Sequence, residues 1–89
     1  MTFQQTIQNI KTAITTGGSA SDFMSEAFIS YYRTNSKKLV SLSGFHFLDS
    51  TNKQLFIDML KVRQMNGCSE DELFKLELVA KKNLGILPE

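Results

Sequence analysis

Residues 2–18, TFQQTIQNIKTAITTGG, carry the start, the apolar face and the end of one amphipathic helix. Thr2 followed three residues later by Gln5 forms a capping box, which satisfies free backbone amides at a helix start. Gly17 and Gly18 predict the helix end, because glycine readily adopts the left-handed conformation that terminates many helices. We therefore expect a helix over about residues 3–16. Its apolar side chains recur on one face at helical spacing: Phe3, Ile7, Ile10 and Ile14.

This apolar face is a narrow stripe, and it has two interpretations. The rest of the predicted helix is mostly Gln, Thr and Asn, with Lys11 as its only charge. Such a stripe can pack into the core of its own bundle, or it can anchor the helix in a groove on a partner protein. We favour packing within the bundle.

The same signals recur along the chain and predict three further main helices, over about residues 21–34, 51–66 and 70–84. Short polar residues precede each of them, and Gly67 and Gly85 follow the last two. The fold class we expect is therefore all-α, a small bundle of four main helices in a single domain, residues 1–89. Sequence spacing predicts that these apolar side chains are buried: Leu55, Phe56, Met59, Leu60 and Val62 in the third helix, and Leu73, Leu76, Ala80 and Leu84, flanked by Phe74 and Val79, in the fourth.

The segment over about residues 37–48 has both a helical and an extended interpretation. In the helical one, a short helix ends at Gly44, and Phe45 contacts Val40 as in a Schellman motif. In the extended one, the alternation of apolar residues through Phe47 indicates two short strands. We favour the helix, because two short strands alone are barely stable.

Composition limits the classes of protein to which the chain can belong. With 42% hydrophobic and 21% charged residues over 89 positions, it has the apolar content of one folded domain. A net charge of +1 provides no general attraction to nucleic acid or to an anionic membrane. A single cysteine, no basic leader and no long apolar run predict a protein of the cytoplasm that does not cross a membrane.

Enzymatic signatures are absent from the sequence. Gly17-Gly18 lacks the spacing and the following lysine of a phosphate-binding loop. A structural zinc site needs about four Cys or His ligands, whereas the chain has only His46 and Cys68. These two could act as base and nucleophile, but nothing else in the sequence indicates an activated thiolate. We therefore predict no catalytic residues, no cofactor, no metal site and no enzyme activity.

Residues 64–73, QMNGCSEDEL, resemble the turn of a DNA-binding helix-turn-helix. The resemblance implies that the following helix would enter the major groove by its N-terminal end. That end carries Glu70, Asp71 and Glu72, whose carboxylates would face phosphates and oppose binding. We interpret the segment instead as a short helical hairpin with a glycine turn, capped by Ser69 and Glu72.

Two function hypotheses follow. The leading one is a non-enzymatic interaction module, a regulator, adaptor or inhibitor of an unknown protein partner, because aromatic residues are enriched at protein interfaces. The alternative is a nucleic-acid-binding regulator, which would use Arg33, Lys37 and Lys38, with Lys53, Lys61 and Arg63 on an adjoining face. A homo-oligomer stays open under either. The candidate interaction surface consists of Tyr31, Tyr32, Arg33, Lys37, Lys38, Phe45, His46 and Phe47.

Overall fold

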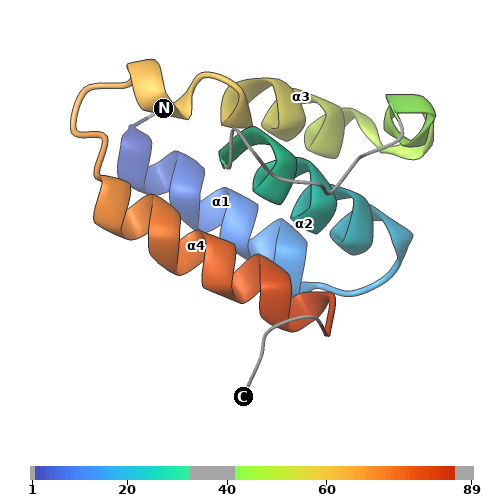
Figure 1. Ribbon diagram of the computed structural model, residues 1–89. Coiled ribbons are helices and arrows are strands. Elements are labelled where there is room, and N and C mark those ends of the chain that lie inside the picture. The colour runs from blue at the N-terminus through green and yellow to red at the C-terminus, as the bar shows by residue number, and fades with distance from the viewer. Residues whose placement is uncertain (1, 33–41, 86–89) are drawn as a thin grey trace.

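The computed structural model describes residues 2–32 and 42–85, and this part of the chain is all-α, as predicted (Figure 1). Four α-helices pack together, and the described residues contain no strand. Two short 3₁₀ helices, η1 and η2, lie in the connections. The elements are α1 Phe3–Thr15, α2 Ser19–Tyr32, η1 Leu42–Phe47, α3 Ser50–Met59, η2 Val62–Gln64 and α4 Glu70–Asn83.

The helices form three layers (Figure 1). The antiparallel helices α1 and α2 make the middle layer, and α1 packs against each of the other three helices. Helix α3 lies on one side of this layer and α4 on the other, where α4 contacts both α1 and α2. Helices α3 and α4 therefore each have a face that points away from the bundle.

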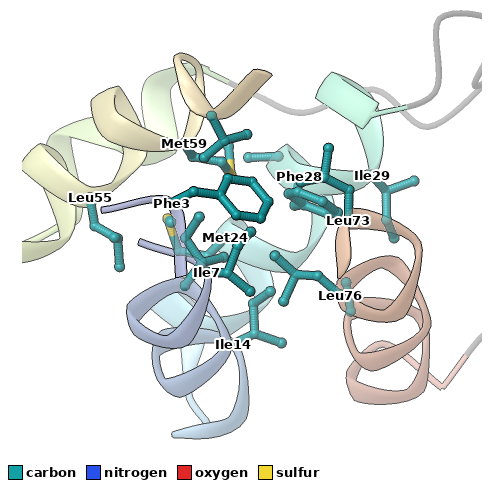
Figure 2. Close-up of a cluster of buried hydrophobic side chains, with 14 of the residues drawn as sticks. Phe3, Ile7, Ile14, Met24, Phe28, Ile29, Leu55, Met59, Leu73 and Leu76 are labelled. Carbon is teal, nitrogen blue, oxygen red and sulfur yellow. The ribbon is translucent and has the colours of Figure 1, made fainter. Parts of the chain in front are cut away.

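The core forms where the inner faces of these layers meet (Figure 2). The stripe on α1 is buried there, with Ile10 and Ile14 at 0% exposure, which confirms that it packs within its own bundle. Burial of one such side chain stabilises the fold by about 1.5–3 kcal/mol. The core side chains drawn in Figure 2 include Phe3, Ile7, Met24, Phe28, Leu55, Met59, Leu73 and Leu76.

Local capping signals are confirmed at three helix starts. The Thr2 hydroxyl accepts a hydrogen bond from the Gln5 amide at 3.1 Å, and the Ser69 hydroxyl accepts one from the Glu72 amide at 3.3 Å. At α3, the Asp49 carboxylate accepts from the Asn52 amide at 2.8 Å. Each bond satisfies a backbone donor that has no partner within its own helix.

The turn between α1 and α2 is tighter than predicted, and α2 begins at Ser19 rather than near residue 21. Gly17 and Gly18 have φ values of +95° and +90°, the left-handed region that glycine reaches without steric cost. The buried Ser21 hydroxyl donates to the carbonyl of Ile14 in the last turn of α1. This bond satisfies one of the carbonyls that a helix end leaves free.

The predicted continuous helix over 51–66 is wrong, because α3 ends at Met59. The chain must cross from the α3 layer to the α4 layer, and it does so through η2, anchored by the fully buried Val62. Leu60, expected in the core, is 45% exposed beside this break. Gly67, at φ +81°, lies in the turn before α4 and does not terminate a helix. The short helical hairpin predicted here is therefore also wrong.

The described part of the central segment, Leu42–Phe47, is the 3₁₀ helix η1 and is not extended. The helix predicted to end at Gly44 falls mostly on residues 37–41, which lie outside the described part. The prediction that Gly44 ends a helix is wrong, because Gly44 lies inside η1. A Cβ at this position would lie 2.7 Å from the Phe23 ring, so only glycine lets η1 approach α2 this closely.

The carboxylate of Glu77 on α4 is buried, although nothing in the amino-acid sequence predicts this. Glu77 is 0% exposed, and Lys81 Nζ lies 3.8 Å from its Oε2. Six residues further along α4, Asn83 donates from Nδ2 to the buried Ser25 hydroxyl of α2 at 2.9 Å. Polar contacts thus accompany apolar packing between α2 and α4.

In the described part of the chain, no helix is both long and apolar enough to span a membrane.

Candidate functional site

The predicted interaction surface separates into two groups in the structure. Tyr31 and Tyr32 lie at the C-terminal end of α2, whereas Phe45, His46 and Phe47 lie in η1. Helix η1 packs near Phe23, nine residues before Tyr32, which is about 14 Å along α2. The structure therefore does not bring the two groups together. The other three predicted residues, Arg33, Lys37 and Lys38, lie outside the described part of the chain.

Arg63 of η2 holds the tyrosine group. Its guanidinium lies 5.6 Å from the Tyr31 ring centroid and 5.1 Å from that of Tyr32, within cation–π range. The Nε and Nη2 atoms each reach a carboxylate oxygen of Glu70 at 3.3 Å, a two-pronged ion pair. Nη2 also approaches the Tyr32 carbonyl at 3.4 Å. One arginine thus ties the end of α2 to the start of α4.

These contacts bear on the nucleic-acid hypothesis. Glu70 neutralises the charge of Arg63, and Lys53 lies 5.7 Å from the Phe45 ring centroid. Of the cations assigned to the adjoining basic face, Arg63 and Lys53 therefore make contacts within the protein, while Lys61 is exposed. The tyrosine rings are half-buried, and Tyr32 stacks on Phe28 at 5.7 Å. No observation on the described residues favours stacking of nucleobases here.

The η1 group is built on a cluster of aromatic rings. Phe45 packs inward against Phe56 of α3 at 5.4 Å between centroids, and Phe56 packs against Phe23 of α2 at 5.5 Å. The close approach of Gly44 to Phe23 joins η1 to these three rings, which we call the aromatic floor. The rings thereby fix η1 between α2 and α3.

Phe47 projects from this floor into solvent. Its side chain is 88% exposed, the highest value among the large apolar residues whose burial the structure describes. Beside it is a small hollow of about 150 Å³ lined by Ser19, Ala20, Phe23, Gly44, Phe47 and Leu48. An exposed aromatic ring on a rigid base next to a hollow has the form of an interface anchor. We call Phe47 and this hollow the η1 surface.

His46 and Cys68, the pair considered for nucleophilic chemistry, have separate environments. His46 is exposed, and its ring meets the edge of Phe45 at 6.5 Å. Cys68 is a half-buried free thiol just before α4. Across residues 2–32 and 42–85, no group of three or more His, Cys, Asp or Glu side chains could hold a metal ion.

A groove of about 610 Å³ lies between α1 and α3. Seven of its twelve lining residues carry hydroxyl or amide groups, and the small apolar residues Ala13 and Ala20 and the buried Leu55 contribute to its mostly apolar surface. Asp58 is the only charged lining residue, and it accepts a hydrogen bond from Gln54 at 3.0 Å. The groove offers hydrogen-bonding groups but no acid–base pair.

The outer face of α4 was missed by the sequence interpretation. Phe74, expected beside the core, is 42% exposed, and Leu78 is 36% exposed. Helical spacing could have identified both, because positions four residues apart share a face. Lys75, between them in sequence, lies 3.4 Å from Asp71, and this hydrogen-bonded carboxylate raises the pKa of the lysine above its ordinary value.

Comparison of the chain with protein-family models, curated proteins and solved structures gave no match. The η1 surface and the outer helix faces are therefore the features that point to a function.

Proposed function

We propose that this protein is a non-enzymatic helical interaction module, a small regulator, adaptor or inhibitor, which contacts a partner protein through the η1 surface. The observation that carries the proposal is the exposure of Phe47, 88%, on a segment fixed by packed aromatic rings. Because the backbone that carries this ring is already fixed, binding has to order only the Phe47 side chain, and the burial of that ring contributes to affinity. Aromatic anchors of this kind dominate the energetics of many interfaces.

The chemistry around Phe47 indicates the kind of partner. The hollow combines the apolar walls of Phe23 and Leu48 with the small residues Ser19 and Ala20, and none of its lining residues is charged. It suits an uncharged apolar side chain of the partner, inserted beside the Phe47 ring. A reducing compartment such as the cytoplasm fits the one free cysteine and is part of the proposal.

The test is affinity capture with the purified protein as bait. Lysate of the source cells is passed over the wild type, over Phe47→Ser, and over Leu78→Ser, which alters an exposed apolar residue on the opposite layer. We expect a specific protein that the wild type and Leu78→Ser retain and that Phe47→Ser loses by about tenfold or more. Equal retention by all three baits would contradict the η1 surface as the contact site.

A salt titration separates this proposal from nucleic-acid binding. Phosphate contacts release counterions, so a nucleic-acid complex weakens steeply as salt rises. We expect no gel retardation of DNA or RNA at about 50 mM salt, where such binding is strongest. Retardation at low salt that disappears at about 200 mM would contradict the proposal and favour a nucleic-acid regulator.

A further inference from the structure

The groove between α1 and α3 has the dimensions of a small-molecule site. Its volume of about 610 Å³ lies within the roughly 300–1,000 Å³ of such sites in other proteins. The C-terminal half of α1 and one face of α3 line it, together with residues at the start of α2. Ala13, Ala20 and the buried Leu55 supply apolar surface. The groove can therefore hold the apolar body of an organic ligand.

Asp58 of α3 is the only charged residue among those that line the groove. It is half-buried, and its Oδ1 accepts a hydrogen bond from Gln54 Nε2 at 3.0 Å, which orients the carboxylate. Glu77, by contrast, has Lys81 as a partner. No lysine or arginine of the described residues forms an ion pair with Asp58, and this includes the exposed Lys61 three positions later. The groove therefore contains a negative charge that no side chain in the described part of the protein neutralises.

Three hydroxyl groups that line the groove already donate their hydrogens to backbone carbonyls. Thr12 Oγ1 donates to the Gln8 carbonyl at 3.0 Å, and Thr16 Oγ1 donates to the Thr12 carbonyl at 2.6 Å. The Ser21 hydroxyl donates to the Ile14 carbonyl. A hydroxyl has one hydrogen and two lone pairs, so each of these oxygens has only acceptor capacity left. The groove therefore suits a ligand that donates hydrogen bonds.

The helix ends beside the groove also favour a positively charged ligand. Thr16 and Gly17 follow the C-terminus of α1, which is the negative end of the helix dipole, and the last turn of α1 has no basic residue. The starts of α2 and α3 are positive dipole ends, but a carboxylate offsets each of them. Asp22 lies in the first turn of α2, and Asp49 caps α3.

The lysines of α1 and α3 point away from the groove. Helical spacing places Lys11 at least about 100° around α1 from every residue of that helix that lines the groove. The same is true of Lys53 on α3, whose Nζ lies 5.7 Å from the Phe45 ring centroid. Neither lysine therefore competes with a ligand for Asp58.

We propose that this groove binds a small organic amine. The ammonium group of the ligand donates hydrogen bonds to the Asp58 carboxylate and to the neighbouring hydroxyl oxygens, and its apolar body lies against Ala13 and Leu55. Hydrogen bonds between ionised partners are roughly twice as strong as neutral ones, so charge as well as shape selects the ligand. This inference goes beyond the proposed function and does not depend on it, because the Phe47 ring does not line the groove.

Three probes of similar shape test the preference for positive charge: 2-phenylethylamine, the neutral 2-phenylethanol and the anionic phenylacetate. Amide NMR of the full chain follows the titration of each probe. We expect 2-phenylethylamine to bind with a Kd of about 0.1–5 mM, as suits a fragment of this size. The alcohol should bind about fivefold or more weakly, and phenylacetate should bind more weakly still. The amides that shift should be those around the groove, near Thr12, Thr16 and Asp58.

Matched variants assign the binding to Asp58. Asp58→Asn removes the charge and keeps the size of the side chain, so we expect it to bind the amine about fivefold or more weakly and to lose the preference for the amine over the alcohol. Asp71→Asn on α4 makes the same change in net charge and should bind the amine as the wild type does. Phe47→Ser should also bind it unchanged, which keeps this test independent of the η1 surface.

A second variant tests the apolar part of the groove. Ala13→Leu places a larger side chain in the groove and leaves Asp58 intact, so we expect it to lower the affinity for the amine and for the alcohol alike. Circular dichroism verifies that each variant retains the helix content of the wild type.

Four results would each overturn the proposal. The first is the absence of saturable amide shifts up to about 20 mM 2-phenylethylamine, and the second is equal affinity for the amine and the alcohol. The third is an Asp58→Asn variant that binds the amine as tightly as the wild type. The fourth is a set of shifts confined to η1 or to the acidic start of α4, which would place the binding elsewhere.

Discussion

Phe28 and Phe47 have the same side chain in opposite environments, at 0% and 88% exposure. Truncation of Phe28 removes a large apolar group from the core, and Phe28→Ala should lower the free energy of unfolding by about 3–5 kcal/mol. Phe47→Ala should change it by less than about 0.5 kcal/mol, because solvent already surrounds that ring. Urea unfolding followed by circular dichroism measures both.

A protein of this size has only about 5–10 kcal/mol of stability, so Phe28→Ala can unfold it. A second pair of variants therefore makes the same comparison with smaller changes. Ile10→Val should cost about 0.5–1.5 kcal/mol, whereas Ile57→Val, at a residue 38% exposed, should cost less than about 0.5 kcal/mol. Equal losses within either pair would contradict the assignment of core and surface.

Gly44 presents a different constraint, since a Cβ there would meet the Phe23 ring at 2.7 Å. Gly44→Ala should destabilise the protein by about 1–3 kcal/mol through overpacking. A double-mutant cycle with Phe23→Leu isolates the contact: the smaller side chain should recover part of the loss. Thermal unfolding of the four proteins gives the coupling, and additive effects would show that the contact does not limit this position.

The break between α3 and η2 gives Leu60 and Val62, which are two residues apart, opposite environments. Val62 is fully buried and Leu60 is 45% exposed. We expect Val62→Ala to lower the free energy of unfolding by about 1–3 kcal/mol and Leu60→Ala to lower it by less than about 1 kcal/mol. The reverse order, measured by denaturant titration, would indicate a different path for this connection.

The Arg63 cluster joins the ends of three elements, so its loss should loosen their junction. Arg63→Ala should cost about 1–2 kcal/mol, the combined effect of two cation–π contacts and a partly exposed ion pair. Arg63→Lys should recover little of it, since lysine lacks the planar fork. Lys61→Ala is the matched control and should be neutral within about 0.5 kcal/mol. Equal stability of Arg63→Ala and Lys61→Ala would contradict this role.

The starts of the helices were predictable because capping depends on residues within one turn. Thr2 and Ser69 act on amides three positions away, and the sequence contains both partners. The end of α3 depends instead on where α4 lies, since Val62 is buried only because the chain crosses the bundle there. Helical spacing alone placed Leu60 inward, as it would have been in a continuous helix.

In the whole molecule, the structure separates the residues of the predicted surface for a similar reason. Phe45, His46 and Phe47 lie together in η1. Their separation from Tyr31 and Tyr32 follows from η1 packing near the start of α2 rather than its end. No local pattern specifies which part of a helix a later segment contacts.

The three-layer arrangement also explains why several apolar side chains are exposed to solvent. Helices α3 and α4 cover opposite sides of α1 and α2, so each keeps one face that no other helix of the described chain covers (Figure 1). Ile57 and Leu60 lie on or next to one outer helix, and Phe74 and Leu78 lie on the other. The η1 surface is distinct from both faces because an aromatic floor supports it.

The most direct test of an η1 contact surface is site-specific photo-cross-linking in the source cells. A photoreactive amino acid replaces Phe47 in one variant and the exposed Lys11 of α1 in another. We expect a discrete protein adduct from position 47 that is absent from position 11. Adducts at neither position, or the same adducts at both, would contradict it.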